Sequence, residues 1–422
     1  MANLNTNLTT TEGLSPTIQT YYDRKMLLNM KPKLVHVQFG QKRPVPRHRG
    51  KTVNFRKWTP FGPTAASLSE GIVPDGQDLA MTEKTAAVRE EGGYVTVSNI
   101  LDLTAFDPVV NDAVEMMSDQ GALTIDTRAR EELTSGTDAT NVIYATGTSR
   151  SAIAASNKLT AVLLRKAVRS LKKAKAKMFT NGSGRPHYVA IIGPDTEYDL
   201  QDDADWKDVA KYQDKEAIYT GEIGQLYGVR VVMTTEAKLF EPKTILDAGT
   251  NIEQTLTLKT IAADAYLSAT PSIQVTATAT DLGSAGIAAL VNKKIVVAGM
   301  TRKITAAAAD ATPANGTVLT LDSALTGFDN KAAALNGLTI YGDGGGKDGN
   351  PVAATLVIAK DAYGVIDIEG SGAVSTTIKP RGSAGTADPL DQISTIGWHV
   401  TAFTTRILQP AWLVRIEHGI SA

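Results

Sequence analysis

The chain has 422 residues, of which 42% are hydrophobic and 21% charged, a mixture typical of globular proteins with a sizeable buried core. Its formal net charge is -1, so no overall field attracts it to nucleic acid or to a membrane, and any such binding has to be local. It contains no cysteine, which excludes disulfides, thiolate metal sites and a cysteine nucleophile.

The first twenty residues predict an extended tail, because they are rich in Thr and Asn and lack hydrophobic periodicity. They show no charged segment followed by an apolar one, so we expect no signal peptide. No apolar run in the chain is long enough to span a bilayer. We therefore expect the protein to be made and used in a cytoplasm.

The segment at residues 31–57 is strongly basic, with nine Lys or Arg, three Pro and no acidic residue. Proline fixes φ and lacks an N–H donor, so we expect this piece to run extended rather than to form a core helix or a central strand. At roughly 3.3 Å per residue, about thirty residues reach ~100 Å. We expect so long an arm to lie across a neighbouring molecule rather than on its own chain.

Two strands are predicted at 52–58 and 87–98, where residues alternate and Val, Thr and aromatic side chains are frequent. The connection between them is rich in Gly and Pro, which is typical of functional or mobile loops. Together these pieces predict a long two-stranded flap. Such a flap is only marginally stable alone, so we expect it to need a partner surface.

Two helices are predicted next. Asp107 and Pro108 suit the cap and first turn of a helix that runs to about residue 134. A second helix is predicted from about 157 to 178, with one apolar and one basic face. The basic face allows three alternatives: solvated surface, pairing with a neighbouring subunit, or sequence-independent contact with DNA phosphates. Its residues are Arg165, Lys166, Arg169, Lys172, Lys173, Lys175 and Lys177.

The composition changes near residue 244. Residues 244–350 are rich in Thr, Ala and Gly and carry many short alternating runs separated by turn signals such as Asn-Gly. This pattern predicts an inserted all-β module of roughly a hundred residues.

Several long blocks of sequence resemble the major capsid proteins of short-tailed bacteriophages. They occur in the order expected for that family and span nearly the whole chain except residues 244–350. The blocks are LSPTIQTYYDRKMLLNMKPKLVHVQFGQKRPVPRHRGKTVNFRKWTP, EGIVPDGQDL, YVTVSNILDLTAFDP, YTGEIGQLYGVRVVMTTEAKLF, LVIAKDAYGVIDIEG, GSAGTADPLDQISTIGW and LQPAWLVRIE.

The resemblance implies an α+β chain with the tailed-phage major capsid fold of the HK-ninety-seven type. That fold has an N-terminal arm, an extended E-loop, a P-domain with a spine helix, and an A-domain. We expect the inserted β-rich module to form a surface domain. The implied boundaries are 1–50 for the arm, 51–98 for the E-loop, 99–158 for the P-domain with its spine helix, 159–243 for the first part of the A-domain, 244–350 for the insert, 351–387 for the A-domain return and 388–422 for the P-domain return.

The resemblance also implies a function: self-assembly into the icosahedral shell that encloses the double-stranded DNA genome of a tailed bacteriophage. The expected partners are many copies of the chain as hexamers and pentamers, scaffolding, portal and decoration proteins, and packaged DNA bound by non-specific charge contact, with no membrane. The expected locations are the virion capsid and, during assembly, the host cytoplasm. The residues expected at intersubunit contacts are Tyr21, Tyr22, Arg24, Lys31, Phe39, Arg43, Arg47, Arg49, Phe55, Trp58 and Tyr94.

The sequence indicates no enzyme, cofactor or metal site. GDGGGKDGN at 342–350 lacks the first glycine of a phosphate loop and has Asp348 where Ser or Thr is required. NGSGRP at 181–186 precedes a strand, so a turn is the better interpretation. Five aspartates at 199–208 are expected on a solvated face. Two other function classes stay open: a nucleic-acid-binding protein that uses 31–57, and a surface adhesin built on the β module.

Overall fold

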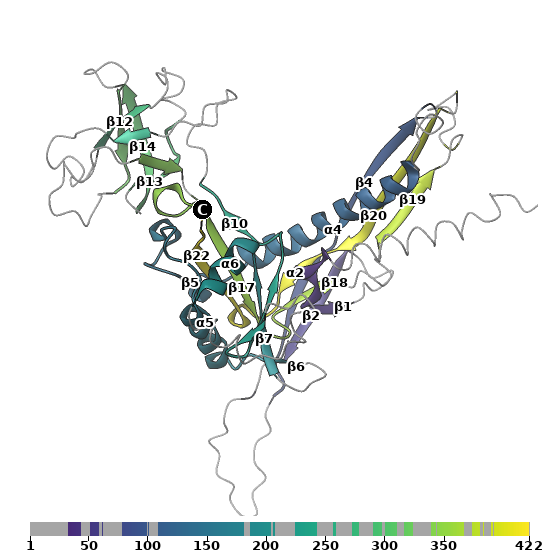
Figure 1. Cartoon of the computed structure of the whole chain (residues 1–422). Coiled ribbons are helices and arrows are strands. Elements are labelled where there is room, and N and C mark those ends of the chain that lie inside the picture. The colour runs from purple at the N-terminus through teal and green to yellow at the C-terminus, as the bar shows by residue number, and fades with distance from the viewer. Residues whose placement is uncertain are drawn as a thin grey trace, which may run out of the picture. The chain divides into compact units, whose positions relative to one another are not determined.

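The chain divides by its internal contacts into two compact units (Figure 1). The first unit contains residues 1–137 and 360–412, and the second contains residues 138–359 and 413–422. The computed structural model describes residues 33–43, 51–58, 61, 78–98, 100, 109–180, 186–203, 206, 224–242, 256–258, 272–277, 290–297, 300–309, 316–323, 339–342, 344–366, 374–379, 383, 390 and 392–421.

The first unit is built on one long helix, α4 (Val109–Ser135), of 27 residues. This confirms the helix predicted at 108–134, although its expected cap, Asp107, lies outside the described residues. Gly136 follows the last turn, and its N–H donates to the carbonyl of Glu132 at 2.9 Å. Residues spaced three and four apart form one buried face, as the 3.6-residue period requires. The buried hydrophobic residues are Val114, Met117, Ala122, Ile125, Ala129 and Leu133, and the polar Ser118 and Asp126 are buried among them.

A three-stranded antiparallel sheet lies along α4, in the order β19 (Val374–Lys379), β20 (Ile393–Phe403) and β4 (Arg89–Ser98) (Figure 1). Val97 and Ile396 pack on Val114 of the helix. The indole N–H of Trp398 donates to Oε1 of Gln120 at 3.1 Å. One face of the sheet is therefore buried by α4.

The predicted pairing of the flap was wrong. The strand at 52–58 is confirmed as β2 (Thr52–Trp58), but its partner is β3 (Met81–Ala87), and β4 pairs with β20 instead. Only one residue separates β3 from β4, so the chain passes directly from the hairpin to the three-stranded sheet. The polar sequence of β3 has no hydrophobic alternation, which is why it carries no strand signal.

The described part of the arm is anchored within the first unit, contrary to the expectation of an extended segment lying on a neighbour. Residues Val35–Gln38 form a short helix, α2. Gln41–Arg43 form β1, which pairs in parallel with β18 (Tyr363–Ile366). Strand β18 in turn pairs with β21 (Thr405–Ile407). The prolines of the arm, at positions 32, 44 and 46, all lie outside β1, so this strand keeps its N–H donors.

The second unit has a mixed sheet whose central strands are almost entirely buried. β10 (Leu239–Phe240) pairs with β17, and β6 (Phe179–Thr180) pairs with β7. The sheet order is β5 (Val142–Tyr144), β22 (Leu413–Gly419), β17 (Val352–Ile358), β7 (Pro186–Ile192), β9 (Val229–Met233) and β8 (Gly224–Leu226).

Among its described residues, this unit has the helices α5 (Ala161–Lys173) and α6 (Pro194–Asp202). Helix α5 is shorter than the predicted 157–178. It ends because Lys175 adopts a left-handed φ of 52° and the N–H of Ala176 donates back to the carbonyl of Leu171 at 3.0 Å. Single 3-10 turns complete the unit at Ala139–Asn141, Arg150–Ala152 and Lys347–Gly349, and a fourth lies at Pro410–Trp412 in the first unit.

Strands between residues 256 and 342 close into a barrel, in agreement with the all-β interpretation of this part of the sequence. Its interior holds Ile273, Ile295, Ile304 and Leu319, each 0% exposed. The barrel order is β11 (Leu256–Leu258), β12 (Ser272–Ala277), β15 (Gly316–Leu321), β14 (Met300–Ala309), β13 (Lys294–Val297) and β16 (Thr339–Gly342).

Within the described residues, no helix combines the length and the apolar character needed to cross a bilayer.

One buried histidine makes the second unit sensitive to acid. His418 on β22 is 0% exposed; its Nδ1 donates to the carbonyl of Gly419 at 2.9 Å, and its Nε2 lies 2.9 Å from the hydroxyl of Thr355. Burial lowers the pKa of His418 from 6.5 to about 4. Below the unfolded-state pKa, the unfolded chain therefore binds a proton that the folded chain excludes.

We predict that stability falls by up to about 3 kcal/mol as the pH drops from above 6.5 to about 4, since each pKa unit corresponds to roughly 1.4 kcal/mol. Urea unfolding of the unassembled protein at several pH values measures this loss. His418→Gln should flatten the dependence between pH 6.5 and 4. An unchanged acid dependence in the variant would assign the effect to other groups.

Candidate intersubunit surfaces

The arm is held to α4 by a buried carboxylate. Asp126 accepts hydrogen bonds from the backbone N–H of His36 at 2.7 Å and from Nδ1 of the same residue at 2.6 Å. Both side chains are only 1% exposed. A buried carboxylate is tolerated only where donors satisfy it, so the position of the arm and the folding of this part of α4 depend on each other.

Strand β18 also contributes to holding the arm. Together, Asp126, His36 and Tyr363 form what we call the buried clasp. The hydroxyl of Tyr363 donates to the carbonyl of His36 at 2.5 Å. Burial, and then the negative charge of Asp126, raise the pKa of Tyr363, so its hydroxyl remains a donor. A side chain at Gly40 would lie 2.4 Å from Val365, so only glycine allows the arm to approach β18 this closely. An exposed ion pair between Lys33 and Asp119 adds a further contact.

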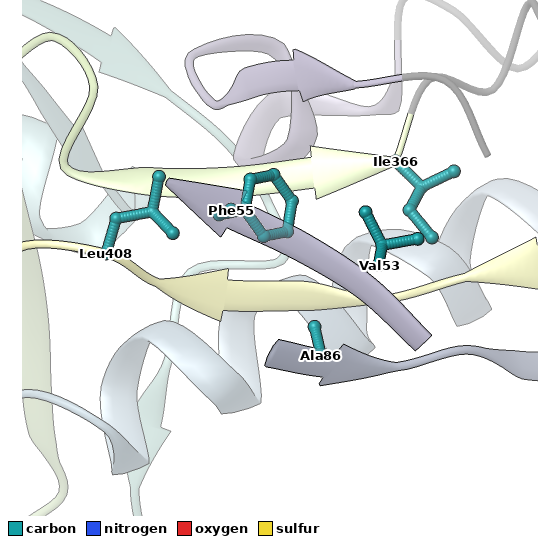
Figure 2. Close-up of a cluster of buried hydrophobic side chains, with 5 residues drawn as sticks. All are labelled: Val53, Phe55, Ala86, Ile366 and Leu408. Atoms are coloured by element: carbon teal, nitrogen blue, oxygen red, sulfur yellow. The ribbon is translucent and has the colours of Figure 1, made fainter. Parts of the chain in front are cut away.

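The base of the β2–β3 hairpin has a small core of its own. Figure 2 shows Val53 and Phe55 of β2 with Ala86 of β3, packed against Ile366 and Leu408. The ring of Phe55 lies over Gly364, where an added Cβ would be 2.3 Å from a ring carbon. The guanidinium of Arg43 donates to the carbonyl of Asn54. The hairpin base is therefore fixed by contacts within its own chain.

The predicted contact residues fall into different environments. Phe55 is 2% exposed and already covered by its own chain, whereas Tyr94 on β4 is 74% exposed. Phe39 and Arg43 lie in the anchored part of the arm, and Trp58 is the last residue of β2. The contacts predicted for all of them stay predictions. Tyr21, Tyr22, Arg24, Lys31, Arg47 and Arg49 lie outside the described residues.

Tyr94 marks the face of the three-stranded sheet that α4 does not cover. Side chains alternate along a strand, so Tyr94 points away from the face that carries Val97. It lies opposite Gly397 on β20, where an added Cβ would be 3.1 Å from the Cβ of Tyr94. Ile393, on the same face, is 44% exposed. The remaining residues of this face include Thr96, Ser375, Thr377, Lys379, Thr395 and His399. This mostly uncharged surface is suited to packing against another protein chain.

A polar cleft of about 430 Å³ lies beside the root of the hairpin. Its two carboxylates are paired, Glu91 with Arg128 at 3.3 Å and Glu132 with Arg406 at 3.2 Å, and Arg89 also lines the cleft. Throughout the described ranges, no group of three or more His, Asp or Glu is placed to hold a metal ion. Both carboxylates of the cleft therefore face an arginine.

The acidic run at 199–208 is not simply a solvated face. Asp199 is 4% exposed and accepts hydrogen bonds from the N–H and hydroxyl of Ser421, at 2.9 and 2.5 Å, as well as an ion pair from Lys158 at 2.9 Å. Burial opposes ionisation, but these bonds outweigh it and lower the pKa of Asp199. Asp203 accepts from the N–H of Ala161 at 2.9 Å. These two carboxylates hold structure together.

Comparison with known proteins identifies the chain. A family model described as phage capsid protein matches residues 82–288. Residues 82–288 are therefore those of a phage capsid protein. The match includes residues 244–288, which the resemblance in sequence had left unassigned. No curated protein sequence matches it.

Solved structures show the same fold at low identity. This capsid protein is similar to the capsid of Ralstonia phage GP4, with 12% identity, a TM-score of 0.53, and coverage of 91% of this chain and 88% of that one. It is also similar to the capsid asymmetric unit of cyanophage Pam1, with 12% identity, a TM-score of 0.50, and coverage of 93% and 92%. The predicted α+β tailed-phage capsid fold is thus confirmed. The role is that of a major capsid protein, a structural component of the virion, and neither open alternative is favoured.

The buried clasp should matter more than the exposed ion pair near it. Asp126→Asn removes the charge that His36 binds, and we predict a loss of about 1–3 kcal/mol with release of the arm. Limited trypsin cleavage after Lys42, together with urea unfolding, measures both effects. Asp119→Asn is the matched control, because an exposed pair contributes about 0–1 kcal/mol. Equal losses in the two variants would contradict the proposed role of the clasp.

The contact between Phe55 and Gly364 can be tested by a double-mutant cycle. Gly364→Ala places a methyl group into the ring of Phe55 and should destabilise the first unit by about 1–3 kcal/mol. In a Phe55→Leu background the same change should cost less, because the smaller side chain leaves room. Urea unfolding of the four proteins gives the coupling. Strictly additive effects would mean that the two residues do not touch.

Proposed function

We propose that many copies of this capsid protein assemble, as hexamers and pentamers, into a closed icosahedral shell around the double-stranded DNA of a tailed phage. The observation that carries the proposal is the match of residues 82–288 to phage capsid proteins, on a fold similar to that of two phage capsids. Closed point-group symmetry lets one chain bury the same surfaces in every copy.

The proposed domains follow the boundaries given above. The arm is 1–50, the E-loop 51–98, and the insert 244–350 is a surface domain. The helix α4 and the sheet beside it suit the spine of a P-domain formed by 99–158 and 388–422. The A-domain consists of 159–243 and 351–387.

The arm, the hairpin and the uncovered sheet face are the proposed contacts between copies. The arm is anchored on its own chain at residues 33–43, and the residues on either side of this anchor are proposed to reach neighbours. Tyr94 supports the proposal most directly, since it is an aromatic side chain 74% exposed on an ordered sheet. Phe55 instead packs in the base of the hairpin, and little of its side chain is exposed for contact with a neighbour.

The other proposed partners are scaffolding and portal proteins, decoration proteins, and packaged DNA bound through non-specific charge contacts. The family suggests a structural rather than an enzymatic role. The proposed place of the protein is the virion capsid, with assembly in the host cytoplasm.

Electron microscopy of the expressed protein, with a scaffolding protein where one is needed, tests the proposal. We expect shells from the unchanged chain. Tyr94→Ala and Trp58→Ala should each reduce shell yield steeply, because a loss of about 1 kcal/mol per copy is repeated at every equivalent contact. Tyr198→Ala, which removes a tyrosine 71% exposed on α6, is the control and should assemble normally.

Two results would contradict different parts of the proposal. Persistent monomers under all conditions, with or without scaffolding protein, would count against a shell-forming role. Normal shells from both Tyr94→Ala and Trp58→Ala would leave that role intact but remove the hairpin and sheet face as contacts.

A further inference from the structure

A basic groove lies in the second unit, between α5 and the turn that joins β8 to β9. Its volume is about 550 Å³. Val168, 7% exposed, lies at its base, and Tyr227 comes from the turn. Four cations line it, and no acidic side chain among the described residues does: Arg165, Arg169, Lys172 and Lys173.

The charge of this groove is not balanced nearby in the sequence. Residues 139–194 contain ten Lys or Arg and no Asp or Glu. None of the four lining cations forms an ion pair within the part of the chain that the structure describes. The helix dipole favours cations in the last turn, which accounts for Lys172 and Lys173 but not for Arg165 and Arg169. Cations four residues apart, such as Arg165 and Arg169, repel each other and destabilise a helix.

The turn places an aromatic ring in the groove. Tyr227 and Gly228 have φ of 50° and 77°, the left-handed conformations of a two-residue hairpin turn. Asn, Asp or Gly favours the first of these positions, and tyrosine does not. The Tyr227 ring is 43% exposed, and the guanidinium carbon of Arg165 lies 5.1 Å from its centroid. A disfavoured backbone conformation that presents an exposed side chain is typical of a binding surface.

We propose that this groove binds the phosphate backbone of nucleic acid without sequence specificity, and so forms the contact of this chain with the packaged genome. The inference rests on the proposed shell-forming function, because the shell brings DNA to the protein. Arg165, Arg169 and Lys173 follow one another at steps of four residues, about 6 Å along the helix, which is comparable to the separation of successive phosphates on one strand. Tyr227 holds the guanidinium of Arg165 and closes one side of the groove.

A nucleic acid fits this surface better than a second copy of the chain. Lysine is depleted at the centres of protein–protein interfaces, whereas runs of Lys and Arg without acidic residues are typical of phosphate-binding surfaces. The sequence alone offered no aromatic residue among these cations. The fold supplies one, because the β8–β9 turn carries Tyr227 to α5.

The test titrates the unassembled full-length protein with a fluorescent 20-base-pair DNA duplex at several salt concentrations. Each phosphate contact contributes about -0.9 to the slope of log affinity against log salt. The triple variant Arg165→Gln, Arg169→Gln, Lys173→Gln should reduce the magnitude of the slope by about 2.7 and lower affinity at least about tenfold at low salt. The matched control removes three exposed cations elsewhere in the same unit and should have little effect: Lys294→Gln, Lys303→Gln and Lys347→Gln.

A single substitution separates binding from folding. Tyr227→Asn puts a favoured residue at the turn, so thermal stability should hold or rise while DNA affinity falls by about two- to fivefold through loss of the cation–π contact. Unchanged affinity in the triple variant, or an equal loss in the control, would overturn the proposal. So would a triple variant that binds DNA normally but no longer assembles, since the groove would then contact another copy. If the unchanged protein forms shells and only the DNA result fails, the proposed function stands without this inference.

Discussion

The hydrogen bonds between the carboxylate of Asp126 and His36 are the interaction on which the first unit depends most. The carboxylate lies in the buried face of α4, where an ionised group without donors would be strongly destabilising. Both donors come from one residue, His36. The carboxylate on α4 therefore has these hydrogen bonds only when the arm is in place. The arm is held in turn by the Tyr363 hydroxyl, and Tyr363 belongs to a strand that pairs with the arm directly. Three elements from distant parts of the sequence, α4, α2 and β18, therefore share one polar centre.

Strand β18 carries this constraint from the arm to the hairpin. Tyr363 donates a hydrogen bond to the arm, and the next residue, Gly364, has no side chain, which leaves space for the ring of Phe55. The two segments that the sequence resemblance assigns to contacts between subunits are thus both attached, at their bases, to one four-residue strand of their own chain. A short anchor of this kind defines the direction in which an arm or a hairpin leaves the body.

The sequence predicted individual helices and strands far better than it predicted which strands pair with each other. The helix α4 was predicted because a regular apolar period extends over many turns, and the barrel strands were predicted because turn residues separate short alternating runs. The partner of β4 was missed because β20 lies about three hundred residues away, and local alternation does not specify a distant partner. The site residues show the same limit. Phe55 and Tyr94 are both aromatic residues in alternating strands, yet one is 2% exposed and the other 74%, because Phe55 has Gly364 to pack on and Tyr94 lies on a face that nothing in the described chain covers.

The net charge of -1 conceals a strong separation of charge along the chain. Residues 31–57 and 139–194 hold 19 of the 43 Lys and Arg and none of the 44 Asp and Glu, so the rest of the chain has 24 cations against 44 acids. Such a chain repels phosphate over most of its length and attracts it in two defined segments. For the proposed DNA-filled shell, this arrangement has a physical advantage over an evenly basic lining. Contacts confined to the proposed groove and screened by salt would hold the nearest DNA in place, while the acidic remainder would keep the bulk of the genome from adhering to the wall.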